Sequence, residues 1–302
     1  MVYLKSFSLP DQVVESGVFT SDFPTYFTTL YPFQVFPAKG LERISFSDIT
    51  IFSGGNGSGK STILNVIGEK LGLHRESFFN KTELYDFYLE LTDFRLDVFD
   101  REKMKALMDI SRIIASDEVF DQILKVRERN ENIDFKRKVI LEKRGEYRYN
   151  PESRPREIHF DDPESIDRYR EYARITNKNT SFSTYVRRHM EANERTYSNG
   201  ENAFRYFTDA IKPGGLYLLD EPENSLSAQY QIDLADFLLG MARYYDCQFI
   251  ISSHSPFLLS IPGADIIDMD SRPVTSCRWT DLPNMRAYHD FFSQHSDEFR
   301  DE

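Results

Sequence analysis

The sequence has little cysteine and no long apolar run, and both absences exclude whole classes of protein. Its 302 residues include two cysteines, Cys247 and Cys277, too few for a disulfide framework or a zinc ribbon. No apolar stretch approaches the ~20 residues that a membrane-spanning helix needs. The first residues lack the apolar core and the cleavage site of a secretion signal. We therefore expect a cytoplasmic protein without membrane insertion.

Charge is distributed unevenly along the chain. Residues 101–200 carry 22 Lys and Arg against 19 Asp and Glu, whereas the rest carry 15 against 30. The net charge of −12 disfavours nonspecific nucleic-acid binding by the protein as a whole. The densest basic stretch runs from Lys125 to Arg156, with 11 basic and 6 acidic residues. Any polynucleotide contact is expected there, and the alternative is a solvated, mixed-charge helical surface.

Apolar strands alternate with helical patterns at both ends of the chain but not in its middle. Strands are predicted at residues 2–9, 34–36, 44–46, 48–52, 216–219 and 248–252, and helices at 61–71, 204–211 and 228–244. Residues from about 75 to 195 are charged and mostly helical in pattern. We expect an α/β fold with a mostly parallel central sheet, N-terminal antiparallel β elements and an inserted helical lobe. The predicted domains are 1–75 with 195–302, and a lobe at 76–194.

A glycine-rich loop separates a predicted strand from a predicted helix. Residues 54–61 read Gly-Gly-Asn-Gly-Ser-Gly-Lys-Ser, which fits G-x-x-x-x-G-K-[ST]. Glycines let backbone N–H groups face phosphate oxygens, and the helix dipole adds to the attraction. Lys60 is expected to reach the β- and γ-phosphates and Ser61 to ligate Mg²⁺. The predicted ATP-binding residues are Gly54, Gly55, Asn56, Gly57, Ser58, Gly59, Lys60, Ser61 and Thr62.

Two adjacent acids end the apolar strand that begins at Leu216. The acids are Asp220 and Glu221. Buried strands seldom end in two acidic residues unless the acids meet a cation or take part in chemistry. We expect Asp220 to hold Mg²⁺ together with Ser61, and Glu221 to accept a proton from an attacking water. Solvated acids at a strand end are the alternative.

Two weaker motifs gain weight from their positions. Ser198-Asn199-Gly200-Glu201 lies 22 residues before Asp220, and His254 lies 34 residues after it. Alone, the first is a turn or helix-cap pattern, and a lone histidine is more often structural.

Together, the four motifs resemble the ATP-binding-cassette (ABC) class of P-loop ATPases. Residues 54–61 are similar to its Walker A loop, 198–201 to its signature, 216–221 to Walker B, and His254 to its switch histidine. The stretch from Asp220 to Ser227 resembles stand-alone members, the SMC, RecF and OLD-like ATPases and small uncharacterised AAA-family ATPases. The resemblance implies a dimer that sandwiches two ATP molecules, with Glu221 and His254 catalytic. It also implies that each signature segment contacts ATP across the interface, through Ser198, Asn199, Gly200 and Glu201.

The sequence departs from that pattern in three ways. Ser198 lies 138 residues after Lys60, a separation that exceeds a typical transporter lobe and falls far short of the long coiled coils of chromosome-organising relatives. No glutamine occurs between Gln34 and Gln122, so the usual Q-loop is absent or displaced, with residues 116–118 or Gln122 as stand-ins. Ser227 occupies the usual D-loop aspartate position.

Two further groups of residues have competing interpretations. Asp268 and Asp270 could suggest nuclease metal ligands, but we interpret them as strand-end acids. Tyr31, Phe33 and Phe36 are candidates for stacking on adenine, although core packing is the favoured interpretation for each.

We therefore expect a soluble Mg²⁺-dependent ATPase that converts ATP and water to ADP and phosphate. It is expected to form a homodimer with ATP and to act with a nucleic-acid or effector partner in DNA repair or phage defence. One alternative is the ATP-binding subunit of a membrane transporter, which the missing Q-loop disfavours. Another is an ATP-gated scaffold with little hydrolysis, which the intact pair of Asp220 and Glu221 disfavours.

Overall fold

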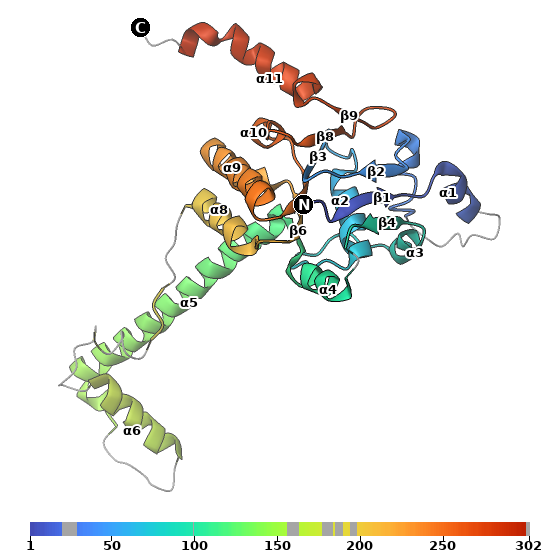
Figure 1. Cartoon of the computed structure of the whole chain (residues 1–302). Coiled ribbons are helices and arrows are strands. Elements are labelled where there is room, and N and C mark those ends of the chain that lie inside the picture. The colour runs from blue at the N-terminus through green and yellow to red at the C-terminus, as the bar shows by residue number, and fades with distance from the viewer. Residues whose placement is uncertain are drawn as a thin grey trace. The chain divides into compact units, whose positions relative to one another are not determined.

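The computed structural model describes residues 1–19, 29–98, 100–155, 163–176, 184, 190–193 and 198–299. The chain divides into two compact units (Figure 1). The first contains Met1–Phe120 and Ser198–Glu302, and the second contains Asp121–Tyr197. Among the described residues, no helix is both long and apolar enough to cross a membrane.

The first unit is built on a six-stranded sheet in the order β5-β6-β7-β3-β8-β9. Five strands run parallel, and β9 pairs antiparallel with β8 at one edge. The strands are β3 (Ile49–Ser53), β5 (Arg112–Ala115), β6 (Leu216–Asp220), β7 (Gln248–Ser252), β8 (Asp265–Asp268) and β9 (Thr275–Cys277). Every residue of β3 and β7 is buried, as expected for a parallel sheet covered on both faces. The predicted mostly parallel sheet is confirmed.

A smaller antiparallel sheet is formed by β2 (Arg43–Ser45), β1 (Leu4–Ser8) and β4 (Asp93–Leu96), in that order. The strand predicted at residues 34–36 is wrong. Gln34 has a φ of 66°, a left-handed conformation that cannot continue a strand. A short 3₁₀ helix, η1 (Pro37–Lys39), follows it. The aromatic residues that suggested a strand pack into the core instead, with Phe33 3% and Phe36 0% exposed.

Helices lie on both sides of the six-stranded sheet (Figure 1). α2 (Lys60–Leu71) packs against β5, β6 and β7, and α9 (Ala228–Tyr244) packs against β7. The apolar residues of α2 at helical spacing, Ile63, Leu64 and Ile67, are fully buried. Further helices of this unit are α1 (Gln12–Val18), α3 (Tyr85–Glu90), α4 (Arg101–Ile110), α8 (Asn199–Ala210), α10 (Pro256–Leu259) and α11 (Pro283–Gln294).

A buried glutamine attaches the small sheet to the large one. Gln248, the first residue of β7, is 0% exposed. Its Oε1 accepts hydrogen bonds from the backbone N–H groups of Tyr3 and Leu4, at 2.9 and 2.8 Å. Its Nε2 donates to the carbonyl oxygens of Leu4 and Ser47, at 2.9 and 3.0 Å. The buried amide is therefore satisfied, as burial requires.

The second unit begins later than the lobe predicted at residues 76–194. Residues 76–120 contribute α3, β4, α4 and β5 to the first unit. β5 is short, and its apolar residues follow the charged helix α4, so the sequence pattern does not separate it from the helical region.

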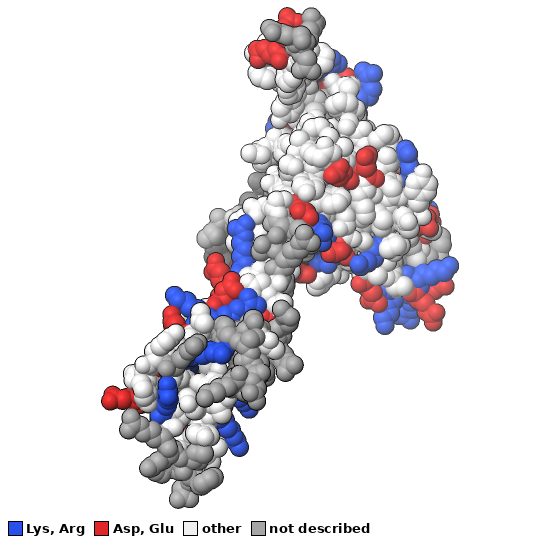
Figure 2. All heavy atoms as spheres, turned by 90° about the vertical axis from the view of Figure 1, so that its left-hand side faces the viewer, with Lys and Arg blue, Asp and Glu red and all other residues white. Residues whose placement is uncertain are grey.

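The second unit contains most of α5 (Ser116–Tyr149) and all of α6 (Pro163–Thr176). Lys143 Nζ lies 2.6 Å from Glu171 Oε1. The rings of Tyr147 and Tyr172 meet edge to face with centroids 5.2 Å apart. Figure 2 shows Lys and Arg interspersed with Asp and Glu over this unit. Residues 125–149 of the basic stretch thus lie on a helical surface of mixed charge. Arg156 lies outside the described residues, and contact of the stretch with polynucleotides stays a prediction.

Candidate nucleotide-binding site

The register of the parallel strands brings the predicted motifs to one edge of the sheet. Asp220, the last residue of β6, lies opposite Ser252, the last residue of β7. Ser252 lies opposite Phe52 of β3, just before the glycine-rich loop. Segments that follow the carboxyl ends of neighbouring parallel strands meet in one crevice. Walker A, Walker B and the loop that carries His254 therefore converge there.

The glycine-rich loop has the backbone that a phosphate site needs. Gly57 and Gly59 have φ values of 78° and 96°, which favour glycine. A Cβ on Gly59 would also lie 3.2 Å from Val35 Cγ1. Gly59 caps α2 without a side-chain hydrogen bond, so the first amides of the helix remain available to an anion. Ser58 Oγ is buried with no hydrogen-bond partner among the described residues. These features fit a bound triphosphate.

The Lys60 ammonium lies inside this loop rather than in solvent. The residue is 4% exposed, and its Nζ donates to the carbonyl oxygens of Gly54 and Gly55, at 2.9 and 3.3 Å. Nζ also lies 3.6 Å from Glu221 Oε1. A buried ammonium needs such compensation, and here the compensation holds the charge beside the loop amides.

Asp220 and Ser61 present oxygen atoms at one point. Ser61 Oγ donates to Asp220 Oδ1 at 3.0 Å, and Ser252 Oγ donates to the same oxygen. Burial raises the pKa of Asp220, and these two hydroxyl groups oppose that rise. Within the described ranges, no cationic group lies within ion-pair distance of Asp220. A carboxylate and a hydroxyl group, with water and phosphate oxygens as the other ligands, suit Mg²⁺.

Glu221 shares Ser252 with Asp220 but differs from it in its side-chain partners. Its φ of 48° and ψ of 53° are left-handed, a conformation that costs an L-residue about 1–2 kcal/mol. Its N–H donates to the carbonyl oxygen and to Oγ of Ser252, at 3.1 and 3.0 Å. Oε2 accepts from Asn224 Nδ2 at 2.9 Å. Oε1 lies 3.6 Å from Lys60 Nζ and 3.5 Å from His254 Nε2. The turn thus directs the second acid towards Lys60 and His254.

The surroundings of His254 favour its neutral form. Burial lowers its pKa most, and the nearby charge of Lys60 lowers it further. Its Nε2 is buried and has no hydrogen-bond partner in the described parts of the chain. The 3.5 Å separation from Glu221 Oε1 leaves this nitrogen available to a nucleotide or a water molecule.

The signature segment is held on a separate helix. Ser198 caps α8, and its Oγ accepts from the N–H of Glu201 at 3.3 Å. A Cβ on Gly200 would lie 2.9 Å from the Tyr230 ring and 3.7 Å from the Ser227 nitrogen. The signature and the D-loop position are therefore neighbours at the start of α9. The structure joins Walker A, Walker B and His254 through direct contacts, whereas these contacts of the signature segment stay local to α8 and α9.

Motif reasoning missed three residues at the site. Ser252 contacts both acids, and Asn224 holds Glu221. Asp270, interpreted as a strand-end acid, accepts a hydrogen bond from the N–H of Gly55 at 2.6 Å through Oδ2. A polar residue at the end of an apolar strand was the available signal for Ser252. No local pattern indicates Asp270, because its partner lies 215 residues away.

Of the three aromatic candidates, the buried Phe36 packs near Gly59 of the phosphate loop, and Tyr31 makes a polar contact at the site. Its hydroxyl group lies 3.3 Å from Thr62 Oγ1, next to the phosphate loop. Phe33 and Phe36 belong to the core.

The candidate stand-ins for the Q-loop follow β5, whose last residue, Ala115, lies opposite Asp220. Glu118 is buried, and its Oε1 accepts from the N–H groups of Glu76 and Ser77, at 3.1 Å each. Glu118 thus fixes the segment after α2. The identity of the Q-loop equivalent stays a prediction.

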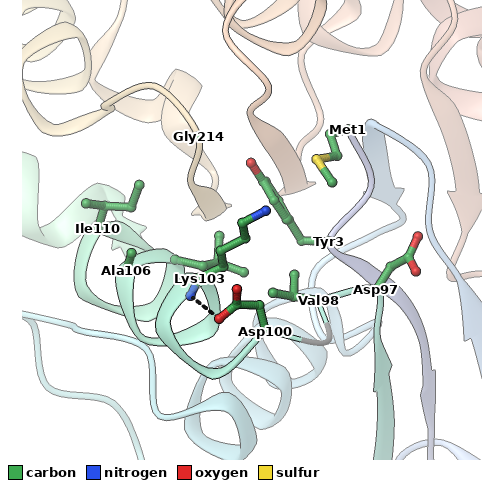
Figure 3. Close-up of a pocket in the computed structure, with 10 residues that line it drawn as sticks. Met1, Tyr3, Asp97, Val98, Asp100, Lys103, Ala106, Ile110 and Gly214 are labelled. Atoms are coloured by element: carbon green, nitrogen blue, oxygen red, sulfur yellow. Dashed lines mark hydrogen bonds between the residues drawn. The ribbon is translucent and has the colours of Figure 1, made fainter.

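A separate pocket of about 520 Å³ lies at the other end of the strands. Figure 3 shows Tyr3, Lys103 and Val98 around it, with Gly214 just before β6. The phosphate loop follows the end of β3, and β3 and β6 run in the same direction. The pocket is therefore distinct from the nucleotide site.

Comparison with solved structures finds several similar chains. The chain is similar to the Smc head domain with an extended coiled coil, bound to the C-terminal domain of ScpA, from Pyrococcus furiosus. That match is 15% identical, with a TM-score of 0.44, and covers 98% of this chain and 100% of that chain. The SMC head domain from Thermotoga maritima is 14% identical, with a TM-score of 0.38 and coverage of 92% and 99%. A nucleotide-free ATP-binding cassette from an ABC transporter is 14% identical, with a TM-score of 0.42 and coverage of 96% of each chain.

The curated proteins contain no match to the sequence. Residues 49–260 match a protein family described as "AAA domain, putative AbiEii toxin, Type IV TA system". The matched range begins at β3 and ends just after α10, so it includes the phosphate loop, both Walker B acids and His254. The P-loop ATPase class predicted from the four motifs is confirmed. The chain belongs to this AAA-domain family.

Proposed function

We propose that the protein binds Mg²⁺ and ATP at this crevice and hydrolyses ATP to ADP and phosphate. One observation carries the proposal: the side chains of two adjacent acids have separate partners. Asp220 is bonded to Ser61, whereas Glu221 lies between Lys60 and His254. A site that only bound nucleotide would not need the second acid in a strained backbone conformation next to a neutral histidine.

The residues divide the work as follows. Bound Mg²⁺ would neutralise charge on the phosphate oxygens, and Asp220 and Ser61 would hold it. Lys60 and the loop amides stabilise the negative charge that moves onto the leaving phosphate. Glu221, with Oε1 free of a hydrogen bond from Asn224, accepts the proton of the attacking water. His254 contributes a neutral ring nitrogen beside that carboxylate.

We further propose that ATP drives homodimer formation. The signature residues Ser198, Asn199, Gly200 and Glu201 lie at the start of α8, beside Ser227. In the ABC class that the sequence resembles, these segments contact the ATP held by a second subunit. The γ-phosphate would complete that interface, so ADP should not support it.

The partner is proposed to be an effector protein. The description of the matched family names a putative toxin of a type IV toxin–antitoxin system, a two-component system in which a second protein acts with the first. A polynucleotide bound through the stretch from Lys125 to Arg156 is the second candidate, because basic residues outnumber acidic ones there.

Phosphate release and ATP titration with purified protein test the ATPase proposal. Lys60→Ala should lose ATP binding by at least ~10- to 100-fold, because a charged hydrogen bond contributes about 1.5–3 kcal/mol. Lys105→Ala, at an exposed position of α4, is the control and should bind as wild type does. Equal ATP affinity in Lys60→Ala and wild type would refute the phosphate-loop assignment. Absence of turnover in wild type with Mg²⁺ and ATP would refute hydrolysis.

A further inference from the structure

Glu223 is a buried acid that motif reasoning does not use. It lies two residues after Glu221, in the short 3₁₀ helix η3 (Pro222–Ser225). Its Oε1 accepts three hydrogen bonds, from Ser253 Oγ at 2.8 Å and from the N–H groups of His254 and Ser255 at 2.6 and 3.2 Å. Its Oε2 is buried without a hydrogen-bond partner among the described residues. Burial raises the pKa of Glu223 despite these bonds.

The three donors belong to consecutive residues, so one carboxylate oxygen fixes the whole loop that carries His254. The shortest of the three bonds is to the N–H of His254 itself. Holding that nitrogen restricts where the imidazole can reach, because the ring is only two rotatable bonds away from the backbone. The ring nitrogen Nε2 then lies 3.5 Å from Glu221 Oε1.

A second connection holds the same loop to the same segment. Ser255 Oγ donates to Gln231 Oε1 at 2.7 Å, and Gln231 Nε2 donates to the carbonyl oxygen of Leu226 at 3.0 Å. The His254 loop is thus attached at two points to the chain that follows Glu221. The distance between Glu221 and His254 is therefore set by residues 223–231 as well as by the strands.

We propose that Glu223 is a positioning residue that sets the His254 imidazole against Glu221. This inference rests on the proposed function, in which His254 serves ATP hydrolysis. Glu223 does so through the backbone of His254 and does not need to contact the nucleotide. A carboxylate suits the task because its oxygen can accept several donors at once and because charge strengthens each bond. A glutamine in its place would put an NH₂ group at the buried Oε2 position, where the described residues offer no acceptor.

Separate measurements of turnover and ATP affinity test the proposal. Glu223→Gln should lower kcat by ~10- to 100-fold, the scale of a misplaced catalytic group. Its Kd for ATP should stay near wild type, because the phosphate loop is unchanged. Glu42→Gln, at an exposed position of the same unit, should change neither. A parallel loss of ATP affinity and turnover would indicate a general structural role and would overturn the proposal.

A double-mutant cycle identifies the residue through which Glu223 acts. In a His254→Ala background, Glu223→Gln should lower kcat no further, since its effect passes through the missing ring. Additive losses would mean independent roles and would overturn the proposal. If Glu223→Gln does not fold, Ser253→Ala, which removes one of the three donors, takes its place in the cycle.

NMR titration of the imidazole provides a readout that does not depend on turnover. The His254 signal can be assigned among the six histidines from its absence in His254→Ala. Glu223→Gln should shift that signal and raise the His254 pKa towards its ordinary value, because a released ring becomes more exposed. An unchanged signal and pKa would overturn the positioning role whatever the ATPase result. A protein without ATPase activity that still shows the shift would refute the proposed function alone.

Discussion

The adjacent acids Asp220 and Glu221 allow the clearest test of the site, because the two conservative substitutions should fail differently. Glu221→Gln keeps the shape of the side chain but cannot accept a proton. Loss of a general base costs ~10²- to 10⁴-fold in rate, or about 3–5 kcal/mol in the activation barrier. The contacts between Lys60 and the loop carbonyl oxygens are untouched. The variant should therefore bind ATP and accumulate as the ATP-bound dimer.

Asp220→Asn should fail at the binding step instead. Oδ1 accepts from both Ser61 and Ser252, and an asparagine oxygen can keep those bonds. The negative charge that would hold Mg²⁺ is lost, and a charged interaction of this kind contributes about 1.5–3 kcal/mol. The affinity for ATP with Mg²⁺ should fall ~10- to 100-fold, and the dimer should be lost as well.

Three measurements separate these outcomes. Single-turnover phosphate release gives the rate, ATP titration with and without Mg²⁺ gives the affinity, and light scattering gives the oligomeric state. Glu42→Gln serves as the control for removing a surface charge. If both variants lose ATP binding equally, Glu221 is a metal ligand or a structural residue. If Glu221→Gln keeps wild-type turnover, another group activates the water, and His254 is the next residue to change.

Three further predictions concern the dimer, the partner and stability. Ser198→Arg should abolish ATP-dependent dimerisation in light scattering but leave ATP binding to the monomer intact. If wild type is a dimer both with and without ATP, the proposal that ATP drives dimerisation is contradicted. Replacing lysines of the basic stretch by glutamate should remove any polynucleotide binding and spare basal ATPase activity. If wild type binds no polynucleotide at low salt with ATP present, a protein partner is favoured. The reversal uses the exposed lysines Lys125 and Lys136, because Arg137, Lys138 and Lys143 form ion pairs within the second unit. Without Mg²⁺ and nucleotide, Asp220→Asn should gain thermal stability over wild type as pH rises from acid to neutral. The raised pKa of Asp220 means that the folded state binds its proton more tightly than the unfolded state, so stability is lost as that proton leaves; a lower Tm of the variant at neutral pH would contradict this.

The sequence by itself determined the parts of this protein that depend on local pattern. The spacing of Ile63, Leu64 and Ile67 indicates α2, and short, mostly apolar segments indicate β3, β6 and β7. The glycine-rich loop between a strand and a helix is a short-range motif, since its glycines adopt the positive φ angles that the turn requires. These elements alternate in a way that few folds accommodate, which is why the parallel sheet could be predicted.

The tertiary structure alone decided how those parts meet. β5 is four residues long and is stabilised by pairing with β6, so its own sequence carries a weak signal. Gln248 and Asp270 bond to residues more than 200 positions away, and no local pattern encodes such partners. Likewise Glu223 accepts a hydrogen bond from the N–H of His254 because the register of β6 on β7 brings together the loops that follow these strands. Local propensity acts over a few residues, whereas side-chain hydrogen bonds in a crevice depend on the packing of the whole sheet.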